Sequence, residues 1–149
     1  MGPFFALGPW DEPYLTIEDK PVTLNDIEHR ILRPIWQDHR LHFVLNCASI
    51  GCPNLSQTAY DAASIAQQLA NAQTAFLQHP RAISFTNKGR LQLTSLFDWY
   101  LTDFAPDVFG LLAYLAVQRP DLAADLAAMA GNADAKIKYV YDWDLNVVD

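Results

Sequence analysis

The sequence is poor in charged residues, and this shortage already excludes some classes of protein. Only 18% of the residues are charged and 51% are hydrophobic, which is the reverse of the composition of a disordered chain. Residues 1–10 have no basic start and contain two prolines, so they fit neither a signal peptide nor a membrane-spanning helix. We therefore expect a folded, soluble protein that is either cytoplasmic or already processed.

Basic residues are scarce as well. Lys and Arg number 10 against 17 for Asp and Glu, so the formal net charge is −7. Because an acidic surface repels nucleic-acid backbones and anionic lipids, we expect neither nucleic acid nor a membrane as a partner. The partner that we expect is a small-molecule substrate, and the sequence leaves the oligomeric state open.

Several catalytic motifs are missing. The chain has no glycine-rich phosphate loop and no dinucleotide fingerprint, so we expect no nucleotide cofactor. It has no Gly-x-Ser-x-Gly elbow and no His-Glu-x-x-His pair, so serine-hydrolase and typical metalloprotease mechanisms lack support. Any chemistry must therefore come from other residues.

The length and the order of the elements indicate the fold class. A chain of 149 residues without repeats or low-complexity linkers is typical of a single domain, here 1–149. Strands and helices occur in mixed runs rather than in regular alternation. We expect an α+β protein in which a small mixed sheet with hairpins packs against about five helices.

The first half of the chain predicts one hairpin, two helices and a strand. Residues 14–18 and 22–24 flank a turn at 19–21, and Asn25 or Asp26 caps a helix that Pro34 ends near Arg33. A compact apolar run over 41–46 predicts a buried strand that leads into a loop. A long helix is expected to begin at Ser56 and to end at His79-Pro80.

The second half predicts a second hairpin, three helices and a final strand. Residues 81–86 and 90–94 pair through a turn in which Gly89 supplies a positive φ. Ser95 and Asp98 have the spacing of a capping box at a helix start. Further helices follow Pro106 and Pro120, the last one closed by Gly131, and 136–143 forms a strand.

The loop after the predicted strand 41–46 holds both cysteines of the chain, Cys47 and Cys52. Four residues separate them. This spacing is compatible with a small disulfide loop, with half of a metal site, or with one reactive thiol and its neighbour.

Four strings stand out, namely Asp26-Ile27-Glu28-His29-Arg30-Ile31-Leu32-Arg33, His42 through Pro53, Phe97-Asp98-Trp99-Tyr100 with Asp103-Phe104, and Tyr141 through Asn146. Together they resemble one family, the domain of unknown function 547 family. They occur in order over 24–146, and their combination is specific although each alone is weak. The resemblance implies a family without an established activity, whose members carry a further N-terminal helical segment. On this basis the chain corresponds to the C-terminal portion of the family.

The leading hypothesis is a small hydrolase that acts on an amide, ester or lactone carbonyl. A cysteine on a loop at a strand end is well placed for nucleophilic attack, if a histidine lowers its pKa and a carboxylate orients that histidine. The predicted catalytic residues are Cys47 as nucleophile, His29 as base, Glu28 or Asp142 as orienting group and Asn46 near the oxyanion. Cys52 and His42 are the alternative pair.

Two metal sites are also considered. Asp142, Asp144 and Asn146 repeat the start of a calcium-binding loop, and Asp149 adds another carboxylate, so Ca²⁺ is the favoured metal. Val147 stands where such a loop needs glycine, which rules out an EF-hand. Zinc is less favoured, because His42, Cys47 and Cys52, with His29 or His39, lack the spacing of structural zinc sites.

Two alternatives to hydrolysis remain. Aromatic side chains stack on sugar rings and acidic ones bind hydroxyl groups, so Trp99, Tyr100, Tyr141 and Trp143 beside Asp98, Asp142 and Asp144 would suit sugar recognition. Apolar and aromatic residues fill most positions of the four strings, as packing in a scaffold would require. The alternative function is therefore a non-enzymatic module that binds a ligand or another protein.

Overall fold

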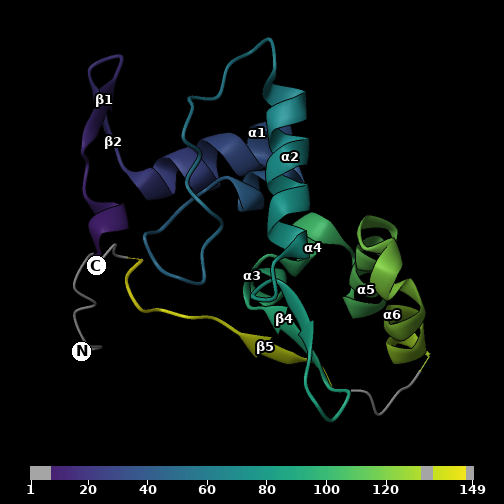
Figure 1. Ribbon diagram of the computed structural model, residues 1–149. Coiled ribbons are helices and arrows are strands. Elements are labelled where there is room, and N and C mark those ends of the chain that lie inside the picture. Colours follow the sequence, from purple (N-terminus) through teal and green to yellow (C-terminus); the bar gives the residue numbers. More distant parts are fainter. Residues whose placement is uncertain (1–7, 132–135, 147–149) are drawn as a thin grey trace. The chain divides into compact units, whose positions relative to one another are not determined.

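The structure is a computed structural model that describes residues 8–131 and 136–146. Its contacts group the chain into two compact units, Met1–Asp38 and His39–Asp149. Helices and strands are mixed along the chain, so the predicted α+β class is confirmed (Figure 1). Among the described residues, no helix is long and apolar enough to cross a membrane.

The first unit begins with a short 3₁₀ turn, η1 (Pro9–Asp11), followed by a hairpin of β1 (Leu15–Ile17) and β2 (Lys20–Val22). The predicted hairpin is confirmed, but its turn lies earlier than expected. Glu18 and Asp19 form the turn with φ angles of 49° and 60°, and Pro21 pairs with Thr16 within the ladder. A two-residue hairpin turn with positive φ matches the twist of the strands.

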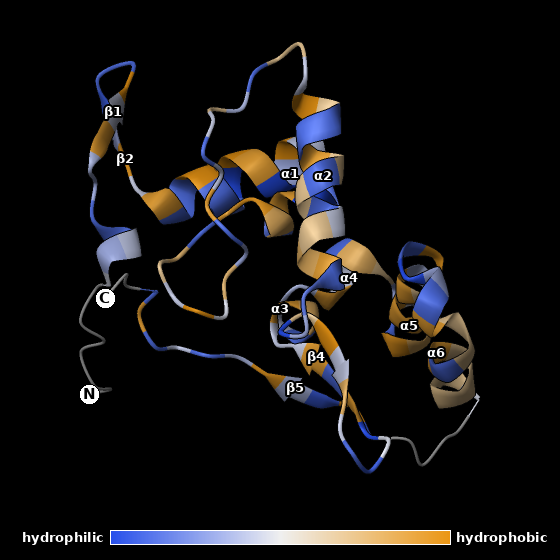
Figure 2. Ribbon diagram, in the orientation of Figure 1, coloured by the Kyte–Doolittle hydropathy of each residue, from blue (hydrophilic) through white to orange (hydrophobic). Residues whose placement is uncertain are grey.

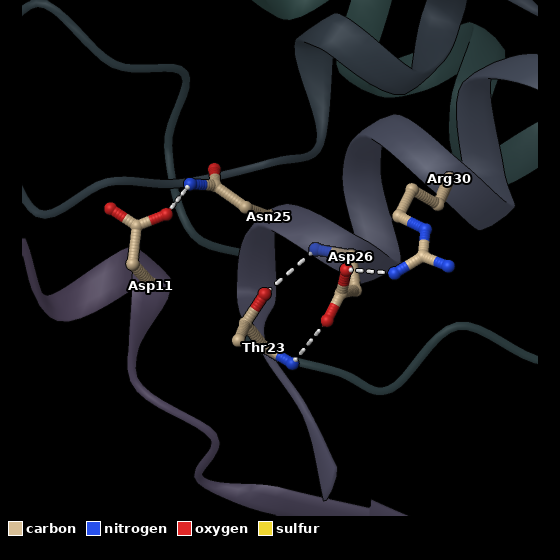
Figure 3. A network of polar contacts seen from close by, with 5 residues as sticks. All are labelled: Asp11, Thr23, Asn25, Asp26 and Arg30. Carbon is tan, nitrogen blue, oxygen red and sulfur yellow. Dashed lines mark hydrogen bonds and ion pairs between the residues drawn. The ribbon is translucent and has the colours of Figure 1, made fainter. Parts of the chain in front are cut away.

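A network of polar contacts starts the helical segment of this unit (Figure 3). The backbone N–H of Thr23 donates to Asp26 Oδ2 over 3.1 Å, and the Asp26 N–H donates to Thr23 Oγ1 over 2.9 Å. These bonds and the Arg30 guanidinium, 2.9 Å from Asp26 Oδ1, hold the pKa of Asp26 below its usual range. The expected cap at Asn25 or Asp26 is therefore a reciprocal Thr23–Asp26 pair.

The helix then continues through Pro34, where it was predicted to end. It consists of a π-helical segment, η2 (Asp26–Leu32), and one α-helical turn, α1 (Arg33–Trp36). Pro34 lies in the first turn of α1, where the missing N–H of proline is tolerated. The helix ends at Gln37, whose φ of 49° is left-handed.

The second unit opens with a 3₁₀ helix, η3 (His39–Phe43), so the strand predicted over 41–46 is wrong. The backbone N–H groups of Val44 and Leu45 both donate to the carbonyl of Leu41, which satisfies them locally instead of in a ladder. The run is apolar because it is buried, with Phe43 only 1% exposed in the core. A loop still follows it, as expected.

The helix predicted from Ser56 begins nine residues later, as α2 (Ile65–Gln78). Local side-chain turns occupy the intervening residues. The Ser56 hydroxyl donates to the Thr58 carbonyl, and the Asp61 carboxylate accepts from the Ala63 and Ser64 N–H groups. Such bonds compete with helix formation, whereas the predicted end at His79 is confirmed.

A three-stranded sheet of order β3-β4-β5 lies in the second unit. Strands β3 (Ile83–Phe85) and β4 (Leu91–Thr94) form the predicted antiparallel hairpin, with Gly89 at φ 70° in its turn. Strand β5 (Lys138–Val140) runs parallel to β4 beside it (Figure 1). It is shorter than the predicted 136–143, because the chain after Val140 pairs with the cysteine loop instead.

The remaining helices pack around this sheet. They are α3 (Leu96–Trp99), α4 (Leu101–Phe104), α5 (Val108–Gln118), η4 (Pro120–Leu122) and α6 (Ala123–Ala130). Hydrophobic residues run along most of α5 (Figure 2), and its Leu111 and Leu115 are fully buried with Leu93 and Phe97. These contacts form the core that supports β4 and the segment after β5.

One predicted helix cap is wrong and another was not foreseen. Ser95 has a helical backbone and makes no side-chain capping bond, although its carbonyl accepts from the Asp98 N–H. Asp107 caps α5 instead, and its carboxylate accepts from the Gly110 N–H over 2.8 Å. Pro120 opens η4 and Gly131 follows the end of α6, as expected.

Candidate functional site

The two cysteines form a disulfide. The bridge joins Cys47 and Cys52, whose Cα atoms are 6.2 Å apart, and the Cys47 N–H also donates to Cys52 Sγ. The spacing of the cysteines left three alternatives open, and the structure contains the first of them, a small disulfide loop. Asn46 braces this loop from both ends of its side chain, because Nδ2 donates to the Pro53 carbonyl over 2.7 Å and Oδ1 accepts from the Ala48 N–H over 2.8 Å.

The hydroxyl of Tyr141 lies at the centre of the loop. It is 3.0 Å from the Sγ atoms of both Cys47 and Cys52 and 2.8 Å from the Ser49 hydroxyl. A disulfide sulfur has no hydrogen, so any bond from this hydroxyl to sulfur has tyrosine as the donor. Burial raises the pKa of Tyr141, and the hydrogen bond with Ser49 partly opposes this rise.

The cysteine loop and the segment after β5 are joined by backbone hydrogen bonds. Gly51 N–H donates to the Asp142 carbonyl over 2.9 Å, Ile50 N–H to the Asp144 carbonyl over 2.8 Å, and Asn146 N–H to the Ala48 carbonyl over 2.8 Å. The loop therefore acts as a short extra strand beside this segment, and a disulfide and a tyrosine hold it in place.

A hollow of about 370 Å³ opens where the loop meets the sheet. We call it the loop hollow. Its volume lies within the range of small-molecule binding sites, roughly 300–1,000 Å³. Its walls include Ile50, Gly51, Arg81, Tyr141, Asp142 and Trp143.

Two aromatic side chains, Tyr141 and Trp143, line the loop hollow, and the ring of Trp99 packs against both of them. The ring centroid of Trp143 lies 4.6 Å from that of Tyr141 and 5.5 Å from that of Trp99, and Trp99 lies 4.9 Å from Tyr141. Trp143 remains 68% exposed and Trp99 46% exposed. These rings are packed against one another and still present a large surface to solvent.

The structure brings only some of the predicted catalytic residues together. Glu28 and His29 belong to the first unit, where Glu28 is buried and His29 Nδ1 accepts from the Arg33 guanidinium over 3.0 Å. Cys47, Cys52, Asn46, His42 and Asp142 belong to the second unit. Because Cys47 and Cys52 are bonded to each other, neither is the thiolate that the predicted nucleophile and a zinc ligand require.

His42, the alternative base, lies in the interior of the second unit at 3% exposure. Its Nε2 is 2.7 Å from Asp103 Oδ2, and its ring stacks on Tyr100 at a centroid distance of 4.0 Å. Sequence reasoning did not assign a role to Asp103, although this residue stands in the Asp103-Phe104 string. The signal that could have identified Asp103 was a carboxylate within a mainly aromatic string.

The predicted calcium ligands lie on the exposed segment after β5. Asp142 Oδ1 accepts from the Asp144 N–H over 3.0 Å, and all three of Asp142, Asp144 and Asn146 are exposed. Within 8–131 and 136–146, no group of three or more His, Cys, Asp and Glu side chains is arranged to hold a metal ion. The fourth predicted ligand, Asp149, lies outside the described residues, and the calcium site stays a prediction.

Arg81 was missed entirely by sequence reasoning. It precedes β3 and lines the loop hollow, where Nη1 donates to the Ile50 carbonyl over 3.1 Å and Nη2 to Asn54 Oδ1 over 2.6 Å. Nothing in the sequence near residue 81 signals this contact, because Ile50 and Asn54 are about thirty positions away.

Comparison with known proteins agrees with the resemblance. Residues 6–77 match the model of a family described as a protein of unknown function, DUF547, and the first two of the four strings lie within this range. The chain therefore resembles this family, as expected. The expected restriction to the C-terminal portion is not matched, since the matched residues are the N-terminal part of the chain. Searches of curated proteins and of solved structures found no match.

Proposed function

We propose that the protein is a ligand-binding module and that its second unit holds a small organic molecule in the loop hollow. The observation that carries this proposal is the solvent-exposed ring of Trp143, which lines a hollow of about 370 Å³ and packs against a second exposed ring, Trp99. Large exposed aromatic surfaces are costly to leave in water, and they are typical of sites that are covered when a ligand binds.

The cysteine loop, which also lines the hollow, supports the same function because several contacts restrain it. The disulfide, the Tyr141 hydroxyl and the backbone bonds to Asp142 and Asp144 all restrain the loop that carries Ile50 and Gly51. A wall that is ordered before binding loses little conformational entropy when the ligand arrives. A ligand-binding module needs such an ordered wall but, unlike an enzyme, needs no reactive group.

The carbonyl hydrolase is the less favoured proposal. Its mechanism needs a thiolate at Cys47, whereas Cys47 is bonded to Cys52. Hydrolysis through this residue would therefore require prior reduction of the bridge. The same bridge bears on location, since disulfides persist in oxidising compartments and are rare in the cytosol. The bridge therefore favours an oxidising compartment, and the cytoplasmic location expected from the sequence stays a prediction.

Titration monitored by NMR tests the ligand-binding proposal. Isotope-labelled protein is titrated with a panel of aromatic acids, aromatic amides, sugar acids and neutral sugars, while the indole N–H signals of the tryptophans are followed. We expect at least one member to shift the Trp143 and Trp99 signals saturably. The Trp143→Ala variant should weaken this binding about tenfold, because it removes a stacking surface.

Trp36→Ala is the matched control, because Trp36 is similarly exposed at 60% but belongs to the first unit. It should leave the binding constant unchanged. A panel in which no member shifts the Trp143 signal contradicts the proposal. So does a panel whose binding is lost equally in the Trp143→Ala and Trp36→Ala variants.

A further inference from the structure

The guanidinium of Arg81 has no acidic partner among the described residues. Its two hydrogen bonds reach neutral acceptors, the Ile50 carbonyl and the Asn54 side chain. The Phe76 ring also lies beside the guanidinium, with its centroid 5.4 Å from Cζ. A positive charge that is half-buried beside an aromatic ring is therefore compensated only by neutral dipoles.

The same guanidinium keeps unused donors. An arginine offers five N–H donors, and the two hydrogen bonds to Ile50 and Asn54 use two of them. Within the described part of the chain, Nε is buried without any hydrogen-bond partner. Because Nε is itself inaccessible to solvent, an oxygen ligand in the hollow would bind the N–H groups of Nη1 and Nη2 that the Ile50 and Asn54 contacts leave over.

Desolvation acts on this residue in the same direction. Burial lowers the pKa of the Arg81 guanidinium, and only the nearby Tyr141 phenol, when ionised, opposes this effect. Arginine nevertheless keeps its proton in proteins, so the cost of the buried charge persists. A bound anion would offset that cost.

The loop hollow has both this positive charge and an exposed aromatic ring in its lining. Arg81 and Trp143 both line it, and Trp143 is exposed. The fork of a guanidinium matches a carboxylate, and an indole face matches a flat apolar surface. The geometry points to a specific class of ligand for the loop hollow, an organic carboxylate whose flat apolar face stacks on Trp143 while its carboxylate binds Arg81.

This inference rests on the proposed function, because it names the ligand class of the same hollow. Two kinds of molecule share the required chemistry. An aromatic acid presents a flat ring, and a sugar acid presents the apolar face of a pyranose ring. The probes are therefore benzoate with its neutral counterpart benzamide, and glucuronate with its neutral counterpart glucose.

The test compares these four probes on the wild-type protein and on two charge variants. We expect the favoured acid to bind at least about tenfold more tightly than its neutral counterpart, as a charge-assisted bidentate contact would provide. Arg81→Gln should remove this preference, and Arg81→Lys should keep only part of it because lysine lacks the fork. Arg90→Gln makes the same change of charge in the same unit and should leave the preference intact.

The outcomes separate the two proposals. If acids and neutral counterparts bind equally at the Trp143 signal, or if Arg81→Gln keeps the preference, the carboxylate inference is overturned and the ligand-binding proposal stands. If none of the four probes shifts the Trp143 signal while another member of the panel does, the carboxylate inference again fails alone. Complete lack of binding overturns both. Dispersed NMR spectra of each variant establish that the fold is retained.

Discussion

Gly51 and Asp142 approach each other so closely that a side chain at position 51 has no room. The Gly51 N–H donates to the Asp142 carbonyl over 2.9 Å, and a Cβ built on Gly51 would lie 2.9 Å from both the backbone N and the backbone O of Asp142. Both contacts are with backbone atoms, which cannot move aside as the end of a flexible side chain can. The contact joins the disulfide loop to the segment that carries Trp143.

Replacement of Gly51 by alanine should therefore destabilise the second unit. We expect a loss of about 1–3 kcal/mol in the free energy of unfolding, because the methyl group forces the two backbones apart. Denaturation in urea measures the change. Gly131→Ala is the control, since its Cβ would meet its nearest neighbour at 3.6 Å, and this variant should stay within about 0.5 kcal/mol of the wild type.

The disulfide should make the protein resistant to alkylation and sensitive to reductant. Iodoacetamide should label neither Cys47 nor Cys52 in the native protein without reductant, as read by mass spectrometry. Opening a bridge that closes a loop with a sequence separation of 5 should cost about 2 kcal/mol of stability through chain entropy. The double variant Cys47→Ser, Cys52→Ser should be insensitive to reductant, and rapid labelling of untreated wild-type protein would refute the bridge.

The buried pair of His42 and Asp103 should stabilise the folded state. Asp103→Ala leaves the His42 ring without its partner at 2.7 Å, in a site where the ring is nearly inaccessible to water. We expect a loss of about 2–4 kcal/mol in the free energy of unfolding. The exposed Asp125 on α6 provides the control, and a similar loss in Asp125→Ala would show that the pair has no special role.

Tyr141 predicts a loss of stability at alkaline pH. Its folded pKa is raised above the ordinary 10.0, first by burial, so the folded state holds the phenol proton more tightly than the unfolded state. The resulting stabilisation is fully present below pH 10.0 and is lost as pH rises through the folded pKa. When unfolding is measured across alkaline pH, the free energy of unfolding should fall less with pH for Tyr141→Phe than for the wild type. The control is Tyr14→Phe, which alters an exposed tyrosine and should behave like the wild type.

Local patterns predicted the elements whose structure depends on nearby residues. The hairpin around Gly89 follows from a turn that needs positive φ, and the end of α2 follows from His79-Pro80. The segment 41–46 could not be predicted in this way. Its apolar run fits a buried strand and a buried 3₁₀ helix equally well, and the choice depends on which backbone groups are available to pair with it.

The candidate site was predictable in part. Cys47, Cys52, Tyr141 and Trp143 all stand in the four strings, and the structure places them in one region. The matched range 6–77 includes only the two cysteines. The pairing of the two cysteines was one of three alternatives, because spacing alone cannot distinguish a bridge from two thiols. Arg81 had no sequence signal at all, since its partners are remote in the chain.

By itself, the sequence determined the α+β class, the two hairpins, most helices and the family resemblance, because these depend on local periodicity, turn residues and short motifs. Only the tertiary structure decided that the cysteines are bonded under the Tyr141 hydroxyl and that Arg81 lies at the loop hollow without an acidic partner among the described residues. These relationships join residues up to 94 positions apart, and distance in space between such residues is set by packing of the whole unit rather than by any local pattern.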